Sequence, residues 1–165
     1  MDKPLAGVAK FSSVFLRLAL GISFLPAVAD RFGLWGAYGQ PNVSWGNYAR
    51  FVDYTAKLNW FLPVSTIPAL SNMATAAETL LGILLVVGWR TRITARLSGV
   101  LLSIFAVAMT LALGVKAPLN FFVFSAAGGA LLLGACTSVP YSLDELPRRN
   151  RYKRSYESEN LGSHN

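Results

Sequence analysis

The sequence predicts an all-α membrane protein: a four-helix bundle with both termini cytoplasmic and a long outer loop between its first two helices. Three observations predict this fold. Apolar residues make up 53% of the 165 residues and charged residues only 14%, whereas a soluble domain carries about 25% charged residues. Several apolar stretches reach the ~20 residues that a spanning helix needs. Finally, Lys and Arg gather on one side of these stretches, as in multi-pass membrane proteins.

The four predicted spans are residues 11–32, 68–88, 93–115 and 117–136. Hydrocarbon offers no water to backbone amides, so each amide must bond within its own segment and each span is a helix. Short turns join the last three spans, which makes them antiparallel neighbours. Residues 1–146 are the predicted transmembrane domain, and residues 147–165 are a basic, disordered cytoplasmic tail.

The outer loop, about residues 33–66, is rich in aromatic residues, which favour the membrane–water interface. Part of it shows apolar residues at three- and four-residue spacing, which predicts a short amphipathic helix on the outer surface or capping the bundle. The residues with this spacing are Tyr48, Phe51, Val52, Thr55, Leu58 and Leu62.

The net charge of +7 follows the rule that Lys and Arg stay in cytoplasmic segments, so we expect no nucleic-acid partner. Only four such residues fall on the predicted outer side, namely Arg31, Arg50, Lys57 and Lys116. The cytoplasmic side carries Lys3, Lys10, Arg90, Arg92, Arg96, Arg148, Arg149, Arg151, Lys153 and Arg154. Those from Arg90 onward are the predicted membrane-surface basic residues, and membrane lipid is their expected partner.

Two charged residues lie well inside the spans, Arg17 and Glu78. Such residues are costly in hydrocarbon and usually face the bundle interior with a partner. Measured from the cytoplasmic helix ends, their axial offset is roughly 6 Å at ~1.5 Å per residue. We therefore hypothesise a buried Arg17–Glu78 ion pair. It either fixes the helix register or faces a ligand, and the sequence leaves both interpretations open.

Two further polar residues, Asp30 and Asn120, lie near predicted outer helix ends and are the candidates for a polar pocket. The simpler interpretation makes Asp30 and its neighbour Arg31 boundary residues that face water. For Asn120 the simpler role is a hydrogen bond across helices.

The sequence holds one cysteine, Cys136, and one histidine, His164. One thiol excludes an intramolecular disulfide and two-cysteine redox chemistry within the chain. A histidine outside the apolar spans disfavours an axially ligated haem, and no metal site is predicted. No nucleophile–base constellation supports independent catalysis.

An alternative to the first span is a secretory signal peptide. Lys3 and Lys10 precede an apolar run that ends with Ala27-Val28-Ala29, a small-residue pattern of the kind that signal peptidase cleaves. Cleavage would leave three spans in the same orientation. Arg17 interrupts the apolar run and favours a retained helix.

Several segments recur together in one known family. They are Arg17–Gly21 with Phe24–Pro26, Asn59–Pro63, Ala77–Gly88, Arg90–Arg92 and Tyr141–Asp144. In order and spacing this set resembles the DoxX family of small bacterial membrane proteins, over about residues 15–146. Arg17 and Glu78 match the recurring intramembrane arginine and glutamate of that family.

The resemblance implies a multi-pass protein of the bacterial inner membrane that is associated with a redox system, as in a subunit of a thiosulfate:quinone oxidoreductase. It implies an accessory or quinone-interacting subunit, with quinone as the one candidate cofactor and a redox protein or a second copy as partner. The alternative is a non-catalytic scaffold or assembly factor. A small transporter ranks last, because few polar residues lie inside the spans.

Overall fold

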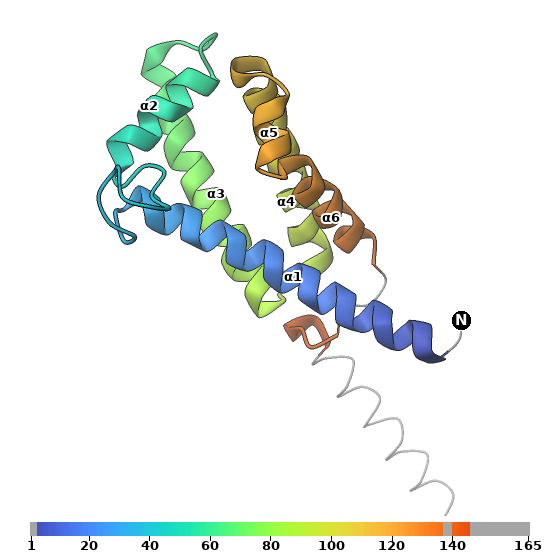
Figure 1. Ribbon diagram of the computed structural model, residues 1–165. Coiled ribbons are helices and arrows are strands. Elements are labelled where there is room, and N and C mark those ends of the chain that lie inside the picture. The colour runs from blue at the N-terminus through green and yellow to red at the C-terminus, as the bar shows by residue number, and fades with distance from the viewer. Residues whose placement is uncertain (1–2, 137–139, 146–165) are drawn as a thin grey trace, which may run out of the picture.

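The computed structural model describes residues 3–136 and 140–145, and its regular elements over these ranges are all helices. The α-helices are α1 (Lys3–Arg31), α2 (Tyr48–Leu58), α3 (Ile67–Val87), α4 (Thr91–Leu113), α5 (Lys116–Asn120) and α6 (Val123–Ala135). Two single 3₁₀ turns, η1 (Val64–Thr66) and η2 (Leu143–Glu145), complete the chain. Figure 1 shows α1 crossing the other long helices, with α2 beside the end at which α3 begins.

Within the part of the chain that the structure describes, three helices are long and apolar enough to cross a membrane, over Gly7–Arg31, Val64–Val87 and Thr91–Leu113. They coincide with the first three predicted spans. An all-helical chain with three such helices is compatible with an integral membrane protein, as the composition predicts.

The fourth predicted span, residues 117–136, is not one helix. The structure divides it into α5 and α6, and Phe122 between them adopts a left-handed backbone with φ of 54°. The break follows Asn120, and asparagine is a residue type that disfavours helix interiors. With 13 residues, α6 reaches only about 20 Å and is shorter than a hydrocarbon core of ~30 Å.

Helices α1 and α3 approach each other closely at two glycines. A Cβ added to Gly21 would lie 2.8 Å from Val86 Cγ2, and one added to Gly82 would lie 3.2 Å from the Gly21 carbonyl oxygen. Without those Cβ atoms the two backbones approach closely, which is how small residues drive helix packing in lipid.

Helices α4 and α6 form a second closely packed pair. A Cβ on Gly99 of α4 would clash with Leu131, and one on Gly134 of α6 would clash with Arg96 Cγ. Arg96 Nε also donates a hydrogen bond of 3.0 Å to the Gly134 carbonyl. The small residues of these helices therefore serve packing within the chain.

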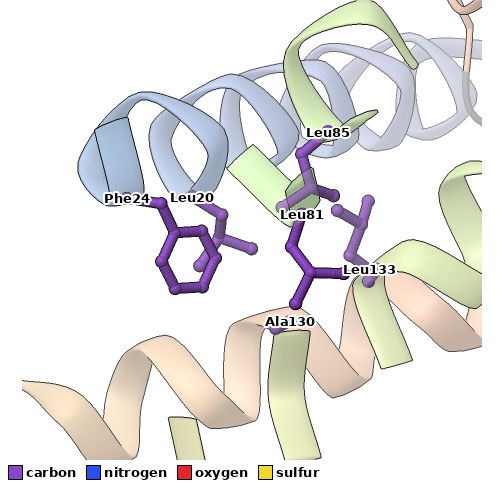
Figure 2. Close-up of a cluster of buried hydrophobic side chains, with 7 residues drawn as sticks. Leu20, Phe24, Leu81, Leu85, Ala130 and Leu133 are labelled. Atoms are coloured by element: carbon purple, nitrogen blue, oxygen red, sulfur yellow. The ribbon is translucent and has the colours of Figure 1, made fainter. Parts of the chain in front are cut away.

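A single apolar cluster joins the two pairs (Figure 2). Its buried members come from α1, α3, α4 and α6: Leu20, Phe24, Leu81, Leu85, Ala95, Ala130 and Leu133. This cluster sets the rotation of α1 and α3, and so decides which of their polar residues point inward.

The amphipathic helix predicted in the outer loop is confirmed as α2, which packs against α3 and α4 and caps one end of the bundle. Its N-terminus is capped by Asn47, whose side-chain oxygen accepts a hydrogen bond from the Arg50 amide at 3.0 Å. Phe51 and Thr55 form its buried face, whereas Leu62 lies beyond the helix. The cap brings Phe51 to the end of α1.

Candidate functional site

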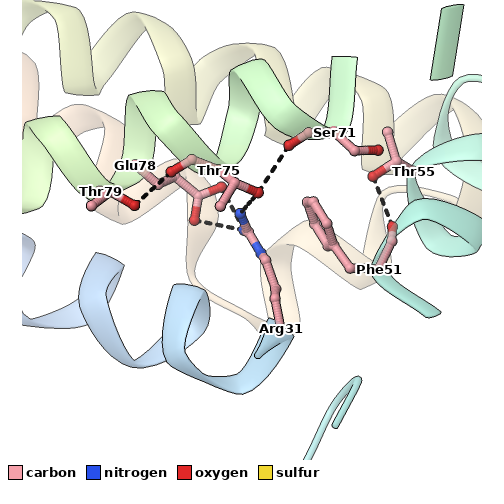
Figure 3. Close-up of polar contacts among 7 residues, drawn as sticks. All are labelled: Arg31, Phe51, Thr55, Ser71, Thr75, Glu78 and Thr79. Atoms are coloured by element: carbon pink, nitrogen blue, oxygen red, sulfur yellow. Dashed lines mark hydrogen bonds and ion pairs between the residues drawn. The ribbon is translucent and has the colours of Figure 1, made fainter. Parts of the chain in front are cut away.

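A buried ion pair lies where the end of α1 meets the middle of α3 (Figure 3). Arg31 Nη2 lies 2.6 Å from Glu78 Oε1 and 2.7 Å from Oε2, so one nitrogen serves both carboxylate oxygens. Arg31 and Glu78 are each only 3% exposed. A pair desolvated to this degree is stable only if further hydrogen bonds complete it.

Helix α3 supplies a further hydrogen bond through a row of hydroxyl groups. Arg31 Nη1 donates to Thr75 Oγ1 at 2.9 Å. The Thr75 hydroxyl in turn donates to the Ser71 carbonyl, and the Ser71 hydroxyl donates to the Ile67 carbonyl, each at 2.9 Å. Each hydroxyl proton is thus used within the helix, which leaves the Thr75 oxygen free to accept from Arg31.

The other face of the guanidinium meets aromatic rings. Arg31 Cζ lies 3.7 Å from the centroid of the Phe51 ring and 5.4 Å from that of Trp45. Trp45 contacts Phe51 edge-on, with ring centroids 5.3 Å apart. Because desolvation strengthens a cation–π contact, the cap helix is held to the bundle by the same arginine that pairs with Glu78.

Asp30 fixes the loop that carries Trp45. Its Oδ2 accepts hydrogen bonds from the backbone amides of Ser44 at 2.8 Å and Trp45 at 3.0 Å. Its Oδ1 accepts a longer one from Gly46 at 3.4 Å. These charge-assisted bonds place the indole beside Arg31. We call Asp30, Arg31, Trp45, Phe51 and Glu78 together the outer-end cluster.

The predicted Arg17–Glu78 ion pair is wrong, because Glu78 pairs with Arg31. Arg17 lies instead beside the C-terminus of α3, where a Cβ on Gly88 would collide with its Nη1. Gly88 is ten residues beyond Glu78, about 15 Å along a helix. The prediction aligned the cytoplasmic ends of two spans, whereas α1 extends past the end of α3 by several turns.

Arg17 has a different partner, the segment that follows α6. Its Nη2 donates to the Tyr141 carbonyl at 2.8 Å. Asp144 in the same segment accepts hydrogen bonds of 2.7 Å from the amides of Arg90 and Thr91, the first turn of α4. This C-terminal clasp, residues 140–145, thus joins the middle of α1 to the first turn of α4 and, through the Asp144 amide, to Gly88 at the end of α3.

The interpretation of Asp30 and Arg31 as water-facing boundary residues is also wrong, since both are buried at 5% and 3% exposure. Asn120 is exposed in α5, whereas Asp30 is buried against the loop whose amides it binds. Arg90, Arg92 and Arg96 are exposed at the start of α4, as a membrane-surface role requires. The remaining predicted surface residues, Arg148, Arg149, Arg151, Lys153 and Arg154, lie outside the described residues.

The sequence did contain a signal for the outer-end cluster. Arg31 ends an apolar run on the predicted outer side, to which the sequence assigns few Lys and Arg residues, so a cation there calls for a partner. The aromatic partners, in contrast, come from a loop whose path no spacing rule predicts.

The outer-end cluster offers little room for a cofactor or metal. Both Glu78 oxygens are bound by Arg31, and Asp30 is bound by the loop. Over residues 3–136 and 140–145, no three His, Cys, Asp or Glu side chains group as a metal site would need. The arrangement is suited to fixing three elements in one register.

No family model matches the chain, and no curated protein or solved structure matches it either. The resemblance to DoxX proteins therefore remains a prediction from the motifs.

Proposed function

We propose that the chain is a multi-pass protein of the bacterial inner membrane that acts as a non-catalytic accessory subunit of a redox system, of the DoxX type. Three helices capable of spanning support the membrane placement. The redox association rests on the resemblance of the motifs alone.

In the proposed topology both termini are cytoplasmic. The exposed Arg90, Arg92 and Arg96 support a cytoplasmic turn between α3 and α4. α5 and α6 together make the fourth crossing, with the break at Phe122 inside it. Such a break is tolerated at membrane depth where the surrounding helices cover the backbone.

One observation favours an accessory role over quinone chemistry: the saturation of Glu78. A carboxylate that handles protons or binds a quinone head group must present an oxygen to its ligand. Both oxygens of Glu78 lie within 2.7 Å of one Arg31 nitrogen, and the residue is 3% exposed. This geometry supports a structural role for Glu78. In that role Glu78 fixes the relative positions of α1, α3 and the cap helix α2, and a partner protein would contact the surface that they form.

The topology is tested by fusing a reporter protein after a chosen residue, with all preceding residues of the chain retained. A fusion after Leu113 should give active alkaline phosphatase, which folds only outside the cytoplasm, and a fusion after Glu145 should give fluorescent green fluorescent protein. Active alkaline phosphatase from both positions would mean that α5 and α6 do not cross, and would end the four-span proposal.

The accessory role is tested by cross-linking in the native membrane, purification and identification of bound proteins and quinones. We expect a redox protein in a ratio near one to one with this chain.

The chain alone should show no saturable quenching of tryptophan fluorescence by a short-chain quinone. Saturable quenching that Glu78→Gln weakens about tenfold or more would instead establish a quinone site. The matched control is Asp53→Asn, an exposed carboxylate of the cap.

A further inference from the structure

An apolar groove runs along α4, away from the outer-end cluster. Its floor is α4 from Val100 to Leu111, one wall is Leu131 of α6, and the other is Phe61 and Asn59 of the corner after α2. The cavity measures about 420 Å³. The groove is open along one side, and its α4 residues Val100, Ile104 and Val107 are more than half exposed.

The polar groups of the groove are already engaged by the protein. The Ser103 hydroxyl donates to the Gly99 carbonyl at 2.8 Å. The Asn59 side-chain amide donates to the Thr55 carbonyl at 2.9 Å. Water is held in cavities that offer two or more polar partners, and the remaining lining here is hydrocarbon. The occupant must therefore be apolar where it contacts α4.

The groove lies at membrane depth. It follows α4, a helix long and apolar enough to span. Val100 to Leu111 covers about 16 Å at 1.5 Å per residue, roughly half of a ~30 Å hydrocarbon core. Its more polar end, at Asn59, belongs to the outer loop. This length and polarity match one leaflet of lipid, with its chain inward and its head group at the surface.

The volume decides between two apolar occupants. A helix of a second copy is at least ~10 Å across. Over the same length such a helix fills roughly 1,200 Å³, several times the cavity, so it would lie across the open mouth of the groove and leave the groove itself unfilled. A single extended hydrocarbon chain is far thinner, and it has no backbone amides that require hydrogen-bond partners.

We propose that this groove binds one acyl chain of a membrane phospholipid, retained as a structural lipid between α4, α6 and the corner after α2. The assignment to the outer leaflet rests on the proposed orientation; the site itself does not. The acyl chain packs against Val107, Ile104 and Leu131, which would otherwise have no packing partners on this side.

The test is native mass spectrometry of the full chain, delipidated in detergent and titrated with dioleoyl phosphatidylglycerol. We expect one tightly bound lipid per chain. Ala108→Trp fills the groove and should weaken that binding about tenfold. Leu97→Trp, on an exposed part of α4 outside the groove, should leave it unchanged.

Ile104→Phe, a smaller filling change, tests the same point if Ala108→Trp does not fold. Equal lipid binding in the groove-filling variants and Leu97→Trp would overturn the proposal. So would protein isolated from its own membrane carrying a polyisoprenoid in place of phospholipid, or a lipid-free dimer that Ala108→Trp dissociates. None of these readouts requires the partner of the proposed accessory function, so the two proposals can fail separately.

Discussion

Glu78 and Arg31 are 47 residues apart in sequence, and their side chains meet at 2.6 Å. The pair joins the end of α1 to the middle of α3, where Glu78 lies one helical turn from Gly82, the glycine that contacts Gly21. It also carries Phe51 of the cap on the opposite side of the guanidinium. One arginine therefore links three elements that the chain connects only through long segments.

Removing one partner of this pair should destabilise the protein strongly. Glu78→Ala leaves the Arg31 charge buried and unpaired, which costs about 3–5 kcal/mol. The double variant Arg31→Met, Glu78→Met should lose much less, because no charge remains uncompensated. Thermal unfolding in detergent, followed by circular dichroism, measures both. Equal losses in the single and double variants would contradict a coupled pair.

The close approach of α1 and α3 should be sensitive to side-chain size at one glycine. Gly21→Leu would insert atoms where a Cβ alone comes within 2.8 Å of Val86 and 3.0 Å of the Gly82 carbonyl. We expect a loss of about 1–3 kcal/mol from overpacking, or helix separation. The control is Gly128→Leu in α6, where nothing lies within 4 Å of an added Cβ. A stable Gly21→Leu variant would mean that α1 and α3 do not pack this closely.

The C-terminal clasp should stabilise α4 through Asp144. Its carboxylate accepts from the amides of Arg90 and Thr91, which have no helical partner at this terminus. Asp144→Ala should lower the unfolding free energy by about 1 kcal/mol, as the loss of a helix cap does. Asp53→Ala, an exposed carboxylate without a capping role, is the comparison. No difference between the two variants would show that the clasp is not formed.

Alkaline pH should weaken the cap, through a tyrosine of α2. Burial raises the pKa of the Tyr54 phenol. Because the folded state then holds this proton more tightly than the unfolded state, stability is unaffected below about pH 10, the pKa of an unperturbed tyrosine. It falls as the pH rises from there through the folded pKa. Ultraviolet titration of the phenolate in wild type and Tyr54→Phe isolates this residue. A Tyr54 that titrates with the exposed tyrosines would contradict its burial.

Sequence reasoning located the long helices because hydrophobicity over 20 residues is a local property. The first three spans and the cap helix agree with the structure to within a few residues, apart from the N-terminal extension of α1 to Lys3. The prediction failed at residues 117–136, because the average apolar character of this segment outweighed Asn120, a helix-disfavouring residue just before the break. The left-handed turn at Phe122 lies in this segment.

The partner of Glu78 could not be predicted for a different reason. The predicted depths of Arg17 and Glu78 were measured from the cytoplasmic ends of the first two spans, and these ends were assumed to be level. The actual offset of α1 against α3 is set by the fit of Gly21 to Gly82 and by the cluster around Leu85. A shift of a few helical turns brought Arg31 to Glu78 and Arg17 to Gly88.

By itself, the sequence determined that this chain forms apolar helices, that a short amphipathic helix lies between the first two, and that an acidic residue is buried in α3. Each follows from the composition of a continuous segment and its preference for hydrocarbon or an interface. Only the tertiary structure decided which arginine neutralises Glu78, where the aromatic cap lies, and what the C-terminal clasp holds. Those contacts join residues far apart in the chain, and their geometry is fixed by close packing, which no local pattern encodes.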